Sequence, residues 1–173
     1  METNLTKINE LSKERENENW KFRSFLKGCD FEKIDLIVQR LYQQISSQID
    51  CKTCANCCKE TQPVLSQKDI ETFSKGLRIS SVQLKERYLQ NSEEFVEEFE
   101  FNKNPCPFLK DNLCTNYAFR PKDCVSYPHL HKEYFLHRLM KVIENYSICP
   151  IVFNVYEALK GEVWHWDDEN DAW

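Results

Sequence analysis

Four of the nine cysteines in this 173-residue chain fall within eight residues, Cys51-Lys52-Thr53-Cys54-Ala55-Asn56-Cys57-Cys58. Four more follow singly, at Cys106, Cys114, Cys124 and Cys149. Clustered soft thiols of this kind suit zinc or an iron–sulfur cluster. The spacing therefore predicts a scaffold that gathers eight thiols around metal.

The scaffold is expected to be helical. Hydrophobic residues recur every three or four positions through residues 31–49, which predicts an amphipathic helix of about five turns that runs directly into Cys51. Asp30 is a favourable N-cap for this helix. The segments beginning at Ser66 and Ser80 carry capping-box signatures, and Cys149-Pro150 opens a last helix that we expect to end at Gly161.

Residues 102–128 contain four prolines, which exclude a long helix there. The segment from Cys106 to Cys114 is typical of a hairpin-like turn, and alternation in residues 95–101 favours a short strand. We therefore predict a mainly α fold with short irregular and β-hairpin segments, a small helical domain organised around a cysteine-ligated metal centre.

The composition divides the chain into three parts. Residues 1–49 form an N-terminal helical extension whose stretch 12–19 is polar, and is either solvated or poorly ordered. Residues 50–161 form the cysteine-cluster metal-binding domain, and residues 162–173 form an acidic, tryptophan-rich tail. The total length fits one domain, since domains centre on ~100–150 residues.

The net charge of −5 argues against a nucleic-acid partner, which needs a basic surface. No apolar run approaches the ~18 residues of a membrane span, and residues 1–19 lack the apolar core of a secretory signal. We therefore expect a cytoplasmic protein, where clustered cysteines indicate metal or redox chemistry rather than disulfides. Only three glycines occur, and none forms a phosphate-binding loop motif.

The arrangement of the ligands stays open. The first three cysteines share the spacing of the bacterial ferredoxin run C-x2-C-x2-C-x3-C-P, but residue 61 is threonine rather than the fourth cysteine. Adjacent thiols such as Cys57 and Cys58 cannot point to one place in an extended strand, so they serve two centres or only one binds metal. Eight thiols allow two four-thiolate zinc sites, or one four-thiolate cluster with spare thiols.

The residues around the cysteines carry weaker signals. Cys29 stands alone after a helix, and an isolated thiol of this kind usually behaves as a small hydrophobic residue. His129 and His131 lie just beyond Cys124 and could ligate metal, but a surface or structural role is the favoured interpretation. Cationic residues that could offset thiolate charge, or simply be solvated, flank the cysteines: Lys52, Lys59, Arg120 and Lys122.

Several motifs accompany the cysteines in order: Cys106-Pro107-Phe108-Leu109, Cys114-x2-Tyr117, Arg120-Pro121-x2-Cys124, Tyr127-Pro128 and Cys149-Pro150. Together with C-x2-C-x2-C-C they resemble the YkgJ-type CxxCxxCC cysteine-cluster family over roughly residues 50–155. This resemblance implies a domain that chelates zinc or iron. The flagellin lysine N-methylases are similar in their cysteine region and are linked to an iron–sulfur cluster and S-adenosylmethionine, although the C-x3-C-x2-C spacing is absent here.

Three functions follow as hypotheses. The first is a metal-binding protein that chelates zinc or iron; the second is an iron–sulfur-dependent oxidoreductase or methylase-like enzyme; the third is a zinc-stabilised protein-interaction module. No acid–base pair stands out, so no catalytic residue is predicted and enzymatic activity is left open. The predicted metal ligands are Cys51, Cys54, Cys57, Cys58, Cys106, Cys114, Cys124 and Cys149.

Overall fold

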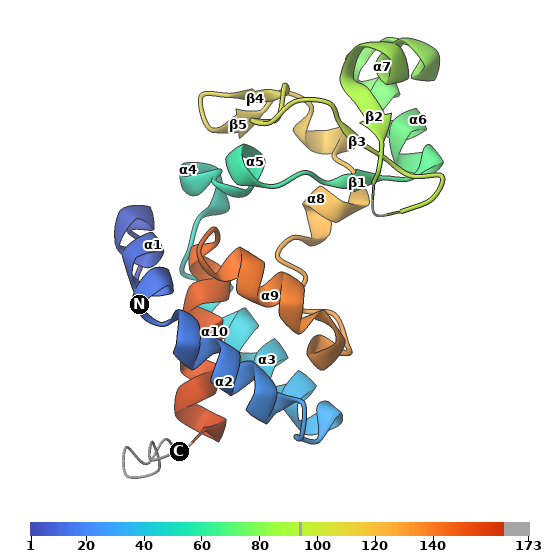
Figure 1. Ribbon diagram of the computed structural model, residues 1–173. Coiled ribbons are helices and arrows are strands. Elements are labelled where there is room, and N and C mark those ends of the chain that lie inside the picture. Colours follow the sequence, from blue (N-terminus) through green and yellow to red (C-terminus); the bar gives the residue numbers. More distant parts are fainter. Residues whose placement is uncertain (94, 165–173) are drawn as a thin grey trace. The chain divides into compact units, whose positions relative to one another are not determined.

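The computed structural model describes residues 1–93 and 95–164. By its internal contacts the chain forms two compact units, one of Met1–Asp50 with Pro128–Trp173 and one of Cys51–Tyr127. Helices dominate, with a few short antiparallel strands (Figure 1), so the predicted mainly α fold with short β segments is confirmed, and the cysteine-ligated metal centre stays a prediction. The predicted boundaries at 49/50 and 161/162 stay predictions, and most of the predicted tail lies outside the described residues.

The first unit is helical in all its regular elements. Helix α10 lies beside α3 and α9 (Figure 1) and buries apolar side chains on most of its circumference, as a central helix does. The regular elements of the first unit are α1 (Leu5–Glu14), α2 (Glu16–Leu26), α3 (Phe31–Ser46), the 3₁₀ helix η2 (Phe135–Arg138), α9 (Leu139–Tyr146) and α10 (Pro150–Val163).

The helix ends only partly follow the predictions. The Asp30 side chain accepts a 3.0 Å hydrogen bond from the Lys33 amide and caps α3 as predicted. However, α3 ends at Ser46, so it does not continue into Cys51. Helix α10 begins at Pro150 as predicted but continues past Gly161 to Val163, because tertiary packing outweighs the weak helix preference of one glycine.

The polar stretch 12–19 is helical except at Arg15, and all its residues but Asn19 are at least partly exposed, which agrees with the solvated alternative. Glu18, near its end, pairs with a buried cation. Lys160 on α10 is 7% exposed, and its Nζ lies 2.7 Å from carboxylate oxygens of both Glu18 and Glu157. Glu157 also accepts a 2.7 Å hydrogen bond from the Tyr146 hydroxyl. A buried ammonium is tolerated when it is paired in this way.

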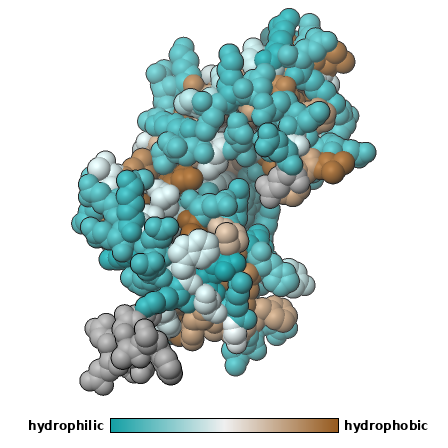
Figure 2. All heavy atoms as spheres, in the orientation of Figure 1, coloured by the Kyte–Doolittle hydropathy of each residue, from teal (hydrophilic) through white to brown (hydrophobic). Residues whose placement is uncertain are grey.

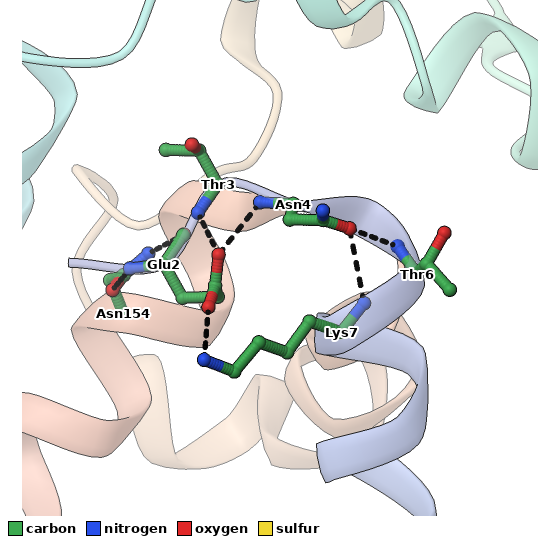
Figure 3. Close-up of polar contacts among 6 residues, drawn as sticks. All are labelled: Glu2, Thr3, Asn4, Thr6, Lys7 and Asn154. Atoms are coloured by element: carbon green, nitrogen blue, oxygen red, sulfur yellow. Dashed lines mark hydrogen bonds and ion pairs between the residues drawn. The ribbon is translucent and has the colours of Figure 1, made fainter.

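The N-terminus is attached to α10 by a reciprocal pair of hydrogen bonds (Figure 3). The Glu2 amide donates to Asn154 Oδ1 at 2.8 Å, and Asn154 Nδ2 donates to the Glu2 carbonyl at 2.6 Å. Asn4 then caps α1, while backbone amides and Lys7 hold the pKa of the Glu2 carboxyl below its ordinary value. Figure 3 shows these contacts converging on the first turn of α1.

Asp35 joins α3 to the start of η2. Its carboxylate is 8% exposed and accepts backbone hydrogen bonds from Tyr134 at 2.6 Å and Phe135 at 2.8 Å. Tyr134 has a left-handed backbone with φ of 60°, so this turn needs external support.

Replacing Asp35 with alanine is expected to lower the free energy of unfolding by about 3 kcal/mol, because two amides lose a charged acceptor and the Phe135 amide stays buried. Urea unfolding followed by circular dichroism measures the change. Asp30→Ala, which removes an exposed N-cap, is the matched control and should cost only ~1 kcal/mol. Equal losses in the two variants would show that the Asp35 contacts contribute no more than a surface cap.

In the second unit a small antiparallel sheet and two helices enclose the core. The strand order is β1-β3-β2, with Leu65 opposite Phe99 and Leu89 opposite Phe101. Both predicted capping boxes are present, and β3 confirms the predicted short strand. These elements are β1 (Val64–Leu65), α6 (Gln67–Leu77), α7 (Ser81–Tyr88), β2 (Leu89–Asn91) and β3 (Phe99–Phe101).

The predicted hairpin is also present. Strands β4 (Leu109–Lys110) and β5 (Leu113–Cys114) pair with Leu109 opposite Cys114. Between them Asp111 and Asn112 have φ values of 50° and 61°, and two positive φ values are what a tight two-residue hairpin loop requires. The turn therefore fixes Cys114 in register with the strand that follows Cys106.

Most of the face drawn in Figure 2 is hydrophilic, with hydrophobic residues scattered across it. None of the helices within residues 1–93 and 95–164 is long and apolar enough to cross a membrane.

Candidate metal centre

The first cysteine segment, Cys51 to Cys58, lies in two consecutive single-turn helices. Helix α4 (Cys51–Cys54) and helix α5 (Cys57–Glu60) are separated by Ala55, whose φ is 48°. The Ala55 amide donates to the Cys51 carbonyl at 2.9 Å, and its carbonyl accepts from the Cys58 amide at 3.1 Å. The left-handed residue interrupts the helical path, so the three cysteines at C-x2-C-x2-C do not share one continuous helix face.

Ala55 is 5% exposed, and its left-handed backbone makes it selective for small side chains. Ala55→Val is expected to lower the free energy of unfolding by about 2 kcal/mol, since a β-branched residue is a genuine outlier at positive φ. Ala55→Gly should change it by less than ~1 kcal/mol, because relief of backbone strain offsets the extra flexibility of the unfolded chain. Thermal unfolding of both variants tests this ranking, and a valine variant as stable as the glycine variant would contradict it.

Six of the eight predicted ligand thiols line one cavity of about 290 Å³. They come from both cysteine regions, although about fifty residues of chain separate those regions. The aromatic side chains of Phe73, Phe101 and Phe108 also line this cavity, which we call the thiol cavity. The six cysteines are Cys51, Cys57, Cys58, Cys106, Cys114 and Cys124.

Hydrogen bonds to backbone amides fix the segments that carry Cys106 and Cys124. The Cys106 amide donates to the Cys58 carbonyl at 2.9 Å, which joins the two cysteine regions directly. Helix α8 (Lys122–Ser126), which carries Cys124, is held by two carboxylates: Asp69 accepts from the Lys122 amide at 3.0 Å, and Asp123 accepts from the Val64 amide at 3.2 Å. Asp69 thus takes part in the capping box of α6 and also holds the first residue of α8, the helix that carries Cys124.

Electrostatics links Cys58 to three other thiols. A hydrogen bond from Cys57, with the positive charges of Arg120 and Lys59, lowers the pKa of Cys58 to about 7. Burial raises the pKa of Cys106 to about 11, and the negative charges of Cys58 and Cys114 add to that rise.

The pKa values of Cys114 and Cys124 are also raised, by burial first and then by the charge of Cys58. A negative charge on Cys58 therefore disfavours ionisation of the other three thiols, and a bound cation would reduce that repulsion.

The two remaining predicted ligands, Cys54 and Cys149, do not line the thiol cavity. Cys54 belongs to α4, and Cys149 is a buried residue of the first unit, just before α10. His131, also in the first unit, packs 5.8 Å from the Tyr42 ring centroid, and burial lowers its pKa. Cys29 donates from Sγ to the Phe25 carbonyl at 3.6 Å. All nine cysteines lie in the described part of the chain, and none forms a disulfide.

The donor set of the thiol cavity fits a soft metal, because thiolates are the preferred ligands of zinc and of iron–sulfur clusters. Within residues 1–93 and 95–164, however, no three Cys, His, Asp or Glu side chains are arranged as a group that could hold a metal ion. The thiols therefore line a common space without converging on one point.

Comparison with known proteins yields one match. Residues 50–150 match the CxxCxxCC family, which is described as a putative zinc- or iron-chelating domain. The chain belongs to the CxxCxxCC family. No curated protein and no solved structure matches it. The predicted resemblance is thus confirmed, and the CxxCxxCC match begins just before the first cysteine segment and ends just after Cys149.

The structure adds residues that the sequence reasoning missed. Phe73 and Phe101 lie on α6 and β3, where no local pattern marks them as part of a site, whereas Phe108 belongs to the motif Cys106-Pro107-Phe108-Leu109. Their rings pack with centroids 4.8 Å apart for Phe73 and Phe108, and 5.4 Å apart for Phe101 and Phe108. Tyr117, which the motif Cys114-x2-Tyr117 had already singled out, also lines the cavity.

Proposed function

We propose that this CxxCxxCC protein binds zinc or iron in the thiol cavity, with Cys58, Cys106, Cys114 and Cys124 as the central ligands. Cys51 and Cys57 line the same cavity and provide further thiols there. Cys54 and Cys149 remain proposed ligands on the strength of the sequence pattern alone. In a reducing cytoplasm all these thiols would be available to the metal.

One observation carries the proposal: thiols from two distant segments of the chain line one cavity, and the charge of Cys58 raises the pKa values of Cys106, Cys114 and Cys124. Without a cation, several thiolates in one half-buried space repel each other. A divalent metal removes that repulsion and favours deprotonation of its ligands. Positive charge from Arg120 and Lys59 near Cys58 acts in the same direction.

The choice of metal decides between the roles that the sequence leaves open. Zinc held by four thiolates would cross-link the cysteine segments and contribute folding energy, as in a chelating protein or a zinc-stabilised interaction module. An iron–sulfur cluster would supply electron transfer, which favours the oxidoreductase or methylase-like alternative.

Anaerobic purification, a visible absorption spectrum and elemental analysis test the proposal directly. We expect zinc or iron to remain bound after dialysis against a weak chelator. A colourless protein with zinc would eliminate the iron–sulfur enzyme, whereas a brown protein with iron and acid-labile sulfide would eliminate the zinc-only function. Protein that retains neither metal when purified anaerobically and then reconstituted would contradict the proposal itself.

A further inference from the structure

The guanidinium of Arg120, which lines the thiol cavity, is held in place by two contacts with Tyr117. The guanidinium carbon of Arg120 lies 3.5 Å from the centroid of the Tyr117 ring, and Arg120 Nε donates a 3.0 Å hydrogen bond to the Tyr117 carbonyl. Stacking on one face and a bond at one edge together fix the plane of the group. The side chain is half-buried and lines the cavity, so it is oriented before any ligand arrives.

The other edge of this guanidinium remains open to a ligand. In the part of the chain that the structure describes, the bond to Tyr117 is the one hydrogen bond that Arg120 donates. Its two Nη groups therefore form a pair of parallel donors, the arrangement that matches the two oxygens of a carboxylate. Lys52, whose Nζ lies 5.5 Å from the same Tyr117 ring centroid, adds a second positive charge.

The rest of the cavity suits the apolar body of an organic molecule. Phe73, Phe101 and Phe108 line it, and all three are at least nine-tenths buried. Its volume of about 290 Å³ is many times the ~30 Å³ share of one water molecule. That volume lies near the lower limit of small-molecule pockets, ~300–1,000 Å³, which typically combine apolar walls with a few fixed polar groups.

We propose that the thiol cavity binds a small organic monocarboxylate, with the Arg120 guanidinium pairing with the carboxylate and the three phenylalanines covering the apolar body. A phosphate dianion fits less well, because thiolates in the same cavity repel each added negative charge. This ligand would share the cavity with the metal proposed above, so the assignment rests on that function for its site.

Benzoate is a suitable probe, titrated by calorimetry into the full-length chain under anaerobic, reducing conditions with and without bound metal. We expect benzoate to bind at least tenfold more tightly than its neutral analogue benzamide. Arg120→Gln should weaken benzoate binding at least tenfold, since it removes a charge-assisted pair of hydrogen bonds. Arg120→Lys should be intermediate, because it keeps the charge but loses the paired geometry.

Lys122→Gln is the matched control, because Lys122 is an exposed cation two residues away that does not line the cavity, and it should change benzoate affinity less than twofold. Circular dichroism checks folding, and Arg120→Lys serves as the test variant if the glutamine variant is unfolded. Absence of benzoate binding, equal binding of benzamide, unchanged binding by the Arg120 variants or tighter binding of phenyl phosphate would each overturn the proposal. Metal content of the same samples separates the two proposals: a chain that retains metal but ignores benzoate contradicts only this one.

Discussion

Replacing Gly76 with alanine is expected to lower the free energy of unfolding by roughly 3 kcal/mol. Gly76 lies in α6, where a Cβ atom would come within 2.1 Å of Asn116 Oδ1 and 2.5 Å of Phe119 Cδ2. Overpacking of this kind costs ~1–3 kcal/mol. Asn116 is 4% exposed and donates a 2.8 Å hydrogen bond to the Phe73 carbonyl, so displacing it also breaks a buried bond worth ~1 kcal/mol.

Gly161→Ala is the control for this prediction. A Cβ at Gly161 would meet no atom within 4 Å, and the residue lies in a helix, so alanine should stabilise the chain by ~0.5–1 kcal/mol. Urea unfolding of the two variants gives the comparison. A Gly76→Ala variant as stable as the wild type would contradict the close packing of α6 against the 3₁₀ helix η1 (Tyr117–Phe119).

Cys58→Ser is expected to reduce bound metal to less than about a tenth of the wild-type amount after dialysis against a weak chelator. Cys58 lines the thiol cavity, its carbonyl accepts the hydrogen bond from the Cys106 amide, and its pKa of about 7 makes its thiolate readily available to a metal. Losing a ligand should weaken binding more than the ~10–100-fold caused by losing a residue that only supports one. Elemental analysis of anaerobically prepared protein measures the effect.

Cys29→Ser is the matched control, since its thiol bonds to the Phe25 carbonyl in the first unit, and its metal content should equal that of the wild type. Cys54→Ser should lose less metal than Cys58→Ser, because Cys54 does not line the thiol cavity. Equal metal in the Cys58 and Cys29 variants would refute the ligand assignment.

Local chemistry made much of the fold predictable. Asp30, Ser66 and Ser80 cap helices at the positions where their side chains can accept backbone hydrogen bonds, and such caps depend on only a few neighbouring residues. The hairpin between Cys106 and Cys114 was predictable for the same reason. Helix ends determined by packing were not: α3 ends before Cys51, and α10 passes through Gly161.

The candidate site also has features that the sequence predicted and features that depend on tertiary packing. The spacing of the cysteines by itself predicted a metal-binding protein, because clustered thiols are preferred ligands of soft metals. Together with the accompanying motifs it also gave the resemblance to the CxxCxxCC family, which the family match confirms. Only the tertiary structure decided which thiols share a cavity, since that depends on a left-handed Ala55 and on the hydrogen bond that joins Cys106 to Cys58. The aromatic wall is likewise a product of packing between segments distant in the chain, because Phe73 lies on α6, Phe101 on β3 and Phe108 directly before β4.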